Sequence, residues 1–541
     1  MRIPVRALIL AAALLPLAAA PAEAGPRHTS LPALTSAPSD ALTRALDAGR
    51  LSEAQYALER ARSLFRLAQV RAKFGHVERA GAHDATLVLR DLAVRLPFLS
   101  RSERAVAQRI LARPDDGPGG VPIGNGWSAP PANQQVECDA NLCVHWVDLA
   151  GDPDRTVTSF KDAVRAALAT VWSAEIDTIG YRAPLDDSAS PNHGPDGKLD
   201  VYLEDLGNLG YFGYCTSDDP DAGNPLVFAV SAYCVLDNDY SATQYGTSQT
   251  PTGFLQVTAA HEFNHASQFA YDWREDAWLM EGTATNMEET VFPAVNDNIL
   301  FLQTSQLRRP ALPLDRSGFF DTEYGAWIFW RYLEEKAYAG DPAVIRRVWE
   351  RADASTPFAP DDHSLRALRL VLASDGKRLP NEYVSFGVAN RLRDYQDRAL
   401  YPATPTHGSY RVGIRRPSTG WRTQRLNHLT LRYYSFRPGR RVSAGARLRV
   451  DVDLTFGSRA RLISYADSGV VTVRPIVLGK GVRGHRSVPF GHGRIKRVDL
   501  VLSNGSYRTE CWQDLDDPPF FSCFGTPTDD RRRHTFRASL R

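Results

Sequence analysis

The chain has 541 residues, of which 43% are hydrophobic and 23% are charged, and its formal net charge is +2. This composition is typical of a folded globular protein, and the length suggests about three domains. The charge is nearly balanced and indicates no partner, and no basic stripe is interleaved with aromatic residues, so we expect no nucleic-acid partner.

The N-terminus has the pattern of a secretory signal peptide. Arg2 and Arg6 precede an apolar run at positions 7–20, and small residues at 22 and 24 suit a signal peptidase. We therefore expect residues 1–24 to be removed and the protein to be secreted. The apolar run is shorter than the roughly 20 residues of a membrane-crossing helix, and no later stretch is long enough, so no membrane span is expected.

Six cysteines in an exported chain predict three disulfides. Pairing each cysteine with its neighbour along the chain closes three local loops. The absence of CxxC pairs argues against thiolate metal sites. The expected disulfides are Cys138–Cys143, Cys215–Cys234 and Cys511–Cys523.

Residues 25–120 are expected to form a helical N-terminal segment. Ser52 with Gln55 and Ser100 with Glu103 both match the capping box, in which each side chain satisfies a backbone donor near the other residue. Residues 113–136 are rich in proline, glycine and asparagine and predict a linker. Two interpretations stay open for the segment: an integral extension, or a pro-region that assists folding or holds the next domain inactive.

Residues 121–400 begin with alternating strand and helix patterns. A strand is predicted at 142–147, an amphipathic helix at 159–179, and two further strands at 199–203 and 226–236. A long uninterrupted helix is then predicted over 254–270. Two acidic runs near these strands carry oxygen ligands suited to Ca²⁺, although neither matches a complete calcium loop. They are Asn192, Asp196 and Asp200, and Asp237, Asn238 and Asp239.

The helix at 254–270 contains the motif HEFNH, formed by His261, Glu262 and His265. Positions i and i+4 share a helix face, so both imidazoles can bind one Zn²⁺ while Glu262 addresses a water beside it. Catalytic zinc takes three protein ligands and leaves one position open. A third ligand must come from elsewhere, because Gln268 and Tyr271 stand where a longer local motif would supply it.

Glu281 is the best candidate for that ligand. Asp276 is placed to cap a second helix on which Glu281 and Glu288 recur on one face, and Gly282 is expected to let this helix approach the first. Asp272, Glu275 and Glu288 remain as alternatives.

The sequence HExxH followed by WLMEGTA resembles the gluzincin metallopeptidases, in which a glutamate on a following helix completes the zinc site. The resemblance implies an α+β zincin-like catalytic domain, with a small twisted sheet, a helical lower lobe and an edge strand able to pair with a peptide. Thermolysin-type members carry an acidic residue four positions after this glutamate. Thr285 stands there instead, which leaves Glu288 or Glu289 to support a zinc-bound histidine.

The rest of the catalytic region, residues 294–400, is expected to be mostly helical. Tyr324 begins an aromatic run suited to the centre of the lower lobe. A tyrosine there can donate a hydrogen bond to a developing oxyanion, so Tyr324 is a candidate catalytic residue, with His363 as a second candidate.

From about residue 401 the apolar pattern alternates with the period of strands, as in Leu448, Val450 and Val452. Residues 401–541 therefore predict a C-terminal, all-β, sandwich-like domain, and no residue in it identifies a ligand.

Together these features predict a secreted zinc metallopeptidase that hydrolyses a peptide or protein substrate. His261, His265 and Glu281 hold Zn²⁺, and Glu262 takes a proton from the attacking water and passes it to the leaving amine. The alternatives are a secreted binding or adhesion protein that keeps a zincin fold, and a zinc hydrolase of another substrate class. The sequence specifies neither the cleavage preference nor the oligomeric state.

Overall fold

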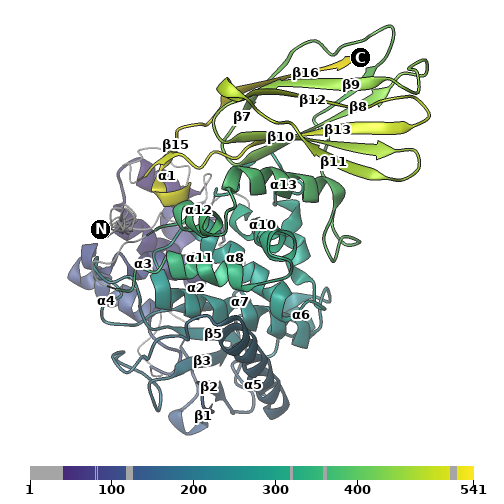
Figure 1. Cartoon of the computed structure of the whole chain (residues 1–541). Coiled ribbons are helices and arrows are strands. Elements are labelled where there is room, and N and C mark those ends of the chain that lie inside the picture. The colour runs from purple at the N-terminus through teal and green to yellow at the C-terminus, as the bar shows by residue number, and fades with distance from the viewer. Residues whose placement is uncertain are drawn as a thin grey trace, which may run out of the picture.

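The computed structural model describes residues 40–79, 81, 83, 85–116, 126–316, 321–356, 362–511 and 521–541. The expected signal peptide, residues 1–24, and part of the expected linker, 117–125, lie outside these ranges. The protein is of the α+β class. A mixed sheet lies at one end, helices fill the middle, and a β domain lies at the other end (Figure 1). Among the described residues, no helix combines the length and the apolar character that crossing a membrane requires.

The described part of the N-terminal segment is helical, as its capping boxes predict. At Ser52 and Ser100 the hydroxyl accepts the backbone N–H of the third helical residue, whose side chain in turn accepts the N–H of the serine. The helices are α1 (Ala41–Asp47), α2 (Glu53–Phe74), α3 (Ala85–Ala93) and α4 (Arg101–Ile110).

The mixed sheet has the order β1-β2-β3-β5-β4. The three central strands are parallel, and both edge strands are antiparallel to their neighbours. Two disulfides join directly opposite residues of an edge strand and its neighbour, Cys138–Cys143 and Cys215–Cys234. The strands are β1 (Gln134–Cys138), β2 (Leu142–Val147), β3 (Leu199–Glu204), β4 (Gly213–Thr216) and β5 (Tyr233–Asp237).

The expected strand at 226–236 is wrong in its first half. Only its end lies in β5, and the preceding residues run along the end of the long helix. There Val230 donates its N–H to Phe269 O at 3.1 Å, and Phe228 O accepts the N–H of Trp273 at 2.9 Å. Hydrogen bonds to the end of this helix take the place of strand pairing. The apolar character of the segment does not distinguish these two arrangements. The expected linker at 113–136 was too long, because β1 begins inside it.

Helices cover the sheet and form the centre of the molecule. The predicted helix at 159–179 is α5 (Thr158–Trp172), continued by a π-helical turn (Ser173–Ile179). The motif helix α7 packs against α5 and against β4 and β5. The other elements here are α6 (Ala242–Tyr245), α7 (Pro251–Asp272) and α8 (Ala277–Val291).

Two expectations for α8 need correction. Asp276 is its N-cap residue, but the Asp276 carboxylate makes no capping bond and instead accepts the N–H of Cys523 at 2.8 Å. Gly282 does not provide the approach to α7. A Cβ at Gly282 would lie 2.9 Å from Nε1 of Trp330, so this glycine lets α10 pack closely on α8.

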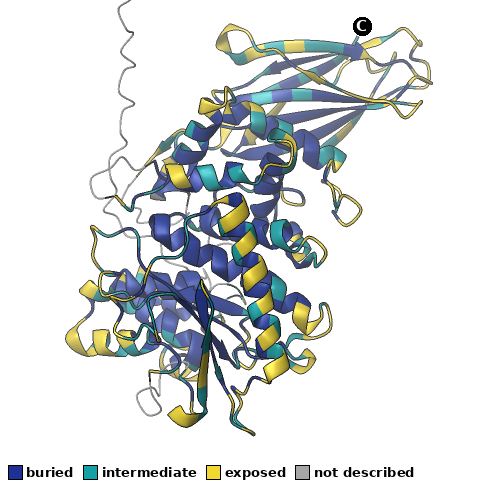
Figure 2. Ribbon diagram, turned by 60° about the horizontal axis from the view of Figure 1, so that its bottom comes forward, coloured by how far each residue is buried: buried dark blue, intermediate teal, exposed yellow. Residues whose placement is uncertain are grey.

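The described residues between 294 and 400, which follow α8, are mostly helical, as expected. Figure 2 shows buried residues running through the middle of the molecule, with exposed residues on turns and on the outer faces of peripheral helices. The helices are α9 (Thr322–Gly325), α10 (Trp327–Tyr332), α11 (Ala343–Arg351), α12 (Leu365–Ser374) and α13 (Leu379–Leu392).

The C-terminal domain consists of two facing sheets, with the orders β11-β10-β13-β8-β6 and β12-β9-β16-β7. Strands of both sheets share one apolar core, which includes Phe436, Val450 and Leu500. Helix α13 packs on the outer face of the first sheet and joins it to the helical region.

The alternating residues Leu448, Val450 and Val452 lie buried in β9, as predicted, and Cys511–Cys523 is the third disulfide. The strands of the two facing sheets are β6 (Gly408–Val412), β7 (Arg422–Leu426), β8 (Thr430–Pro438), β9 (Arg447–Asp453), β10 (Ser458–Ala466), β11 (Val471–Pro475), β12 (Arg483–Pro489), β13 (Ile495–Asn504) and β16 (Arg532–Leu540). A separate two-stranded sheet is formed by β14 (Thr509–Glu510) and β15 (Thr526–Pro527).

Candidate metal centre

Helix α7 presents both motif histidines to α8. The helix is capped by Thr250, whose hydroxyl accepts the N–H of Gly253, and every residue from Gly253 to Asp272 except Gln256 is buried. His261 and His265 lie one turn apart, and their Nε2 atoms are 3.1 Å apart. The two rings therefore point at one position between the helices.

Glu281 on α8 points at the same position. Its Oε2 lies 3.2 Å from His261 Nε2 and 3.4 Å from His265 Nε2, and all three side chains are almost fully buried. Zn²⁺ bound tetrahedrally at about 2.0–2.1 Å from its ligands holds neighbouring ligand atoms roughly 3.3 Å apart. The three distances match that spacing.

Two of the three alternative third ligands lie elsewhere. Asp272 and Glu275 form a separate buried cluster with His363, where α7 ends and α8 begins. The Nε2 atom of His363 is 3.1 Å from Glu275 Oε1 and 3.2 Å from Asp276 Oδ1. His363 therefore belongs to an ion-pair network at that junction.

The other ring nitrogen of each motif histidine has its own partner. His261 Nδ1 lies 2.8 Å from Glu288 Oε1, and His265 Nδ1 lies 2.8 Å from Gln268 Oε1. With a hydrogen on each Nδ1, both Nε2 atoms carry the lone pair that a metal requires. Glu288 was one of the two residues expected for this support, whereas Glu289 instead accepts from Asn298. Thr285 is buried and its hydroxyl has no hydrogen-bond partner among the described residues.

Gln268 is the support that the sequence interpretation missed, and its spacing of three residues from His265 was the available signal. Its Nε2 donates to Asn264 Oδ1 at 2.8 Å, and to Met280 O and Thr283 Oγ1 at 3.0 Å. Asn264 then donates to the buried Glu175 at 2.8 Å. This chain of bonds fixes the amide, so the orientation of the His265 ring depends on residues of α7, of α8 and of the π-helical turn that follows α5.

The electrostatics of the cluster favour a positive charge at its centre. Burial alone would raise the pKa of Glu281, but the charge of His265 and hydrogen bonds to both imidazoles lower it to about 2. Burial would lower the pKa of His261, yet hydrogen bonds to Glu281 and Glu288 raise it well above its usual value. A bound cation would take the place of those protons.

Glu262 lies on the same helix with its carboxylate beside the edge of the mixed sheet. Burial raises the pKa of Glu262. Its Oε2 accepts a hydrogen bond from the hydroxyl of Thr86 on α3 at 3.0 Å. A Cβ at Gly213 on β4 would lie 3.1 Å from Cγ of Glu262, so the edge strand passes close by. Nothing in the sequence indicated the contact with Thr86, because the two residues are 176 positions apart.

Tyr324 lies beside the histidines. Its ring centroid is 6.1 Å from that of His261 and 4.9 Å from that of Phe301, and the residue is 1% exposed. His83, from the N-terminal segment, lies 5.8 Å from the Tyr324 ring and stacks on Phe212 at 4.9 Å. The candidate oxyanion donor is therefore adjacent to the cluster.

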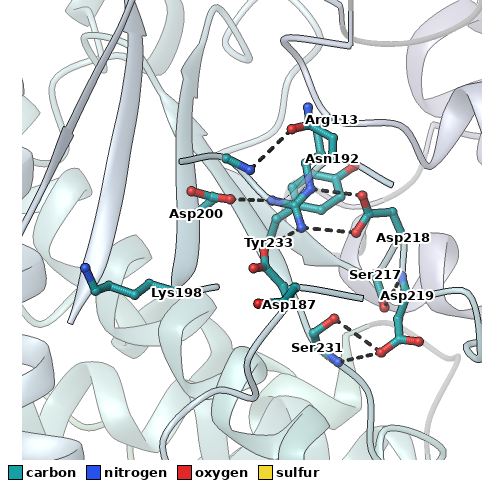
Figure 3. A network of polar contacts seen from close by, with 12 residues as sticks. Arg113, Asp187, Asn192, Lys198, Asp200, Ser217, Asp218, Asp219, Ser231 and Tyr233 are labelled. Carbon is teal, nitrogen blue, oxygen red and sulfur yellow. Dashed lines mark hydrogen bonds and ion pairs between the residues drawn. The ribbon is translucent and has the colours of Figure 1, made fainter. Parts of the chain in front are cut away.

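The acidic runs considered for Ca²⁺ have protein partners. Asp200 is paired with Arg113 (Figure 3) and with His145, and Asp196 with Lys198. The Oδ2 atom of Asp237 accepts the N–H of Leu206 at 3.0 Å. These carboxylates are therefore engaged by other groups of the protein.

The donor set of the central cluster fits zinc. Two imidazoles and one carboxylate match the ligands of a catalytic zinc site. The second carboxylate oxygen of Glu281 is buried and has no hydrogen-bond partner among the described residues. An ion between the three side chains would satisfy the nitrogens and the carboxylate together.

No family model and no curated protein matches the chain. Among solved structures, the pre-peptidase C-terminal domain of a collagenase from Bacillus anthracis matches at 12% identity with a TM-score of 0.15, covering 25% of this chain and 97% of that one.

Proposed function

We propose that this protein is a secreted, zinc-dependent metallopeptidase with a zincin-like catalytic domain. One observation carries the proposal: His261 Nε2, His265 Nε2 and Glu281 Oε2 converge at 3.1–3.4 Å, with Glu262 beside His261 on the same helix. Three disulfides support an extracellular location. An antiparallel edge strand beside the motif helix supports the fold assignment.

The metal ion and the protein side chains would have different roles in the reaction. Bound zinc would supply a water of near-neutral pKa and polarise the scissile carbonyl. Glu262 takes the proton of that water during attack and transfers it to the leaving amine. Its pKa, raised by burial, suits a group that must both accept and release a proton. Tyr324 is the proposed donor to the developing oxyanion.

The decisive experiment measures zinc content and caseinolysis of the secreted protein before and after treatment with a chelator. We expect one zinc per chain, and activity that is lost with the metal and restored by adding it. Glu262→Gln should keep the zinc and lose at least a hundredfold in turnover. Glu281→Ala should lose zinc.

Two outcomes would contradict this proposal. Glu262→Gln protein that hydrolyses casein as fast as the parent would remove Glu262 from the mechanism. Zinc-loaded protein without activity on any peptide would favour a binding protein or a hydrolase of another substrate class.

A further inference from the structure

The nearly balanced net charge of the chain hides a strongly uneven distribution. The β domain, residues 401–541, contains 26 arginine and lysine residues and 10 aspartate and glutamate residues. Residues 25–400 contain 36 basic and 51 acidic residues. The β domain is therefore strongly basic, whereas the rest of the expected secreted chain is acidic.

Four connections between strands lie at the end of the sandwich that faces away from the helical region (Figure 1). The opposite end joins the helical region, where Leu314 donates its N–H to Leu429 O at 3.1 Å. No described segment of the helical region packs on the first end. We call these four connections the outer rim, which consists of residues 413–416, 439–446, 467–470 and 490–494.

The outer rim is one continuous surface. Backbone hydrogen bonds of 2.9 Å join neighbouring connections, and their donors and acceptors are Gly439 N and Val412 O, Phe490 N and Ala446 O, and Asp467 N and Arg494 O. The connections follow the order of the first sheet, β11-β10-β13-β8-β6. Five neighbouring strands give the rim a length of about 20 Å.

The outer rim carries positive charge along its length. Within the described ranges, none of its arginines is paired with a carboxylate, whereas Arg449 and Arg537 on the face of the second sheet share Asp451. The rim contains one acidic residue, Asp467. Its charge is therefore available to an anionic partner. The exposed arginines of the rim are Arg415, Arg416, Arg440, Arg441 and Arg494.

Apolar side chains are exposed at both edges of the same surface. Ile414 is 64% exposed beside the end of β6, and at the other edge Val470 is 58% exposed and Val471, the first residue of β11, is 44% exposed. A soluble polyanion such as an acidic polysaccharide gains nothing from these side chains. A bilayer with anionic lipids attracts arginines and also accepts apolar side chains between its headgroups. The combination favours a lipid surface.

We propose that the outer rim is a docking surface for a bilayer that contains anionic lipids. The arginines bind lipid phosphates, and Ile414 and Val470 enter the headgroup region without any segment crossing the bilayer. The acidic remainder of the chain is repelled by the same lipids, so the candidate metal centre faces away from the membrane. This inference goes beyond the proposed peptidase function and does not depend on it.

The test measures sedimentation of the full secreted chain with lipid vesicles. The vesicles contain phosphatidylcholine alone or an equimolar mixture with phosphatidylglycerol. We expect binding to the mixed vesicles only, and weaker binding as the salt concentration rises, because ions screen the attraction. The double variant Arg440→Ala, Arg441→Ala should bind the mixed vesicles about 30-fold more weakly than the parent.

The matched control is the double variant Arg425→Ala, Arg533→Ala. These exposed residues lie directly opposite each other on β7 and β16, and Arg533 is about 20 Å along β16 from the rim. The control removes the same charge from the same domain, but it should bind nearly as well as the parent. Equal weakening by both double variants would overturn the inference, because the total charge of the domain would then explain binding.

A fluorescent probe distinguishes lipid docking from binding of a soluble polyanion. All six cysteines form disulfides, so a dye that responds to its environment can be attached selectively in the variant Ile414→Cys. Its emission should shift to shorter wavelength with mixed vesicles but not with heparin. The variant Val477→Cys is the control, because Val477 is 69% exposed at the opposite end of the sandwich, and its dye should not shift.

Two further results would overturn the inference. The first is binding to heparin or DNA without binding to the mixed vesicles, which would assign the basic rim to a soluble polyanion. The second is a protein that binds the vesicles while the dye at position 414 shows no shift, because the rim would then not be the surface in contact with lipid.

Discussion

His261 hydrogen-bonds through Nδ1 to Glu288, at 2.8 Å, while its Nε2 faces Glu281. Both glutamates lie on α8, about two helical turns apart. Helix α8 thus supplies both Glu281, the proposed third ligand, and Glu288, which supports the proposed ligand His261. Glu288 makes the contact that was expected of an acidic residue at the position of Thr285.

The first prediction concerns this support. Glu288→Gln should weaken zinc binding about 10- to 100-fold, because the charged acceptor that orients the His261 ring is lost. Titration of the apoprotein against a competing zinc chelator measures the effect. Glu289→Gln is the matched control, since Glu289 is buried on the same helix but bonds to Asn298. Equal weakening by both variants would mean that general damage to α8 causes the loss.

Much of the site could be predicted from the sequence because it depends on local periodicity. Helical spacing places His261 and His265 on one face of α7, and it places Glu281 and Glu288 on one face of α8. Pairing each cysteine with its neighbour along the chain likewise predicted all three disulfides, because each closes a local loop.

Other features depend on long-range packing and gave no local signal. Strand β4 has only four residues, too few for an alternating pattern. The side chain of Asp276 was expected to cap α8, but a backbone N–H from Cys523, distant in the sequence, takes that carboxylate. Thr86 is an ordinary helix residue whose role comes only from the strand and helix it contacts.

The second prediction concerns Gln268. Gln268→Leu should lower both zinc affinity and stability, because it leaves His265 Nδ1 and Asn264 Oδ1 without their partner. Each unsatisfied buried group costs about 1–3 kcal/mol. Gln268→Glu keeps an acceptor for His265 while losing the amide donors, so it should bind zinc more tightly than Gln268→Leu. Urea unfolding together with zinc titration separates the two effects, and indistinguishable zinc affinities would contradict the role in orienting His265.

The third prediction tests Tyr324 as an oxyanion donor. Tyr324→Phe keeps the ring against His261 and Phe301 but removes the hydroxyl. We expect kcat to fall at least tenfold with little change in KM or zinc content, because the bond strengthens as charge develops on the oxygen. Steady-state kinetics on a peptide substrate measures this. An unchanged kcat would assign the tyrosine to packing alone.

The last prediction concerns the stability of the junction between the helical region and the β domain. His428 is 1% exposed, and its Nε2 lies 2.6 Å from Asp315 while its Nδ1 lies 3.3 Å from Asp530. Burial would lower its pKa, but the charge and hydrogen bond of Asp315, reinforced by Asp530, raise it from 6.5 to about 9.

Because the folded state holds this proton more tightly than the unfolded state, the stabilisation is complete below about pH 6.5 and is lost as the pH rises through 9. The shift corresponds to at most about 3 kcal/mol. The free energy of unfolding should therefore fall more between pH 6 and pH 9.5 in the parent than in His428→Gln. His485→Gln, which changes an exposed histidine on β12, should follow the parent. Parallel pH profiles for the parent and His428→Gln would show that the ion pair contributes nothing to the junction.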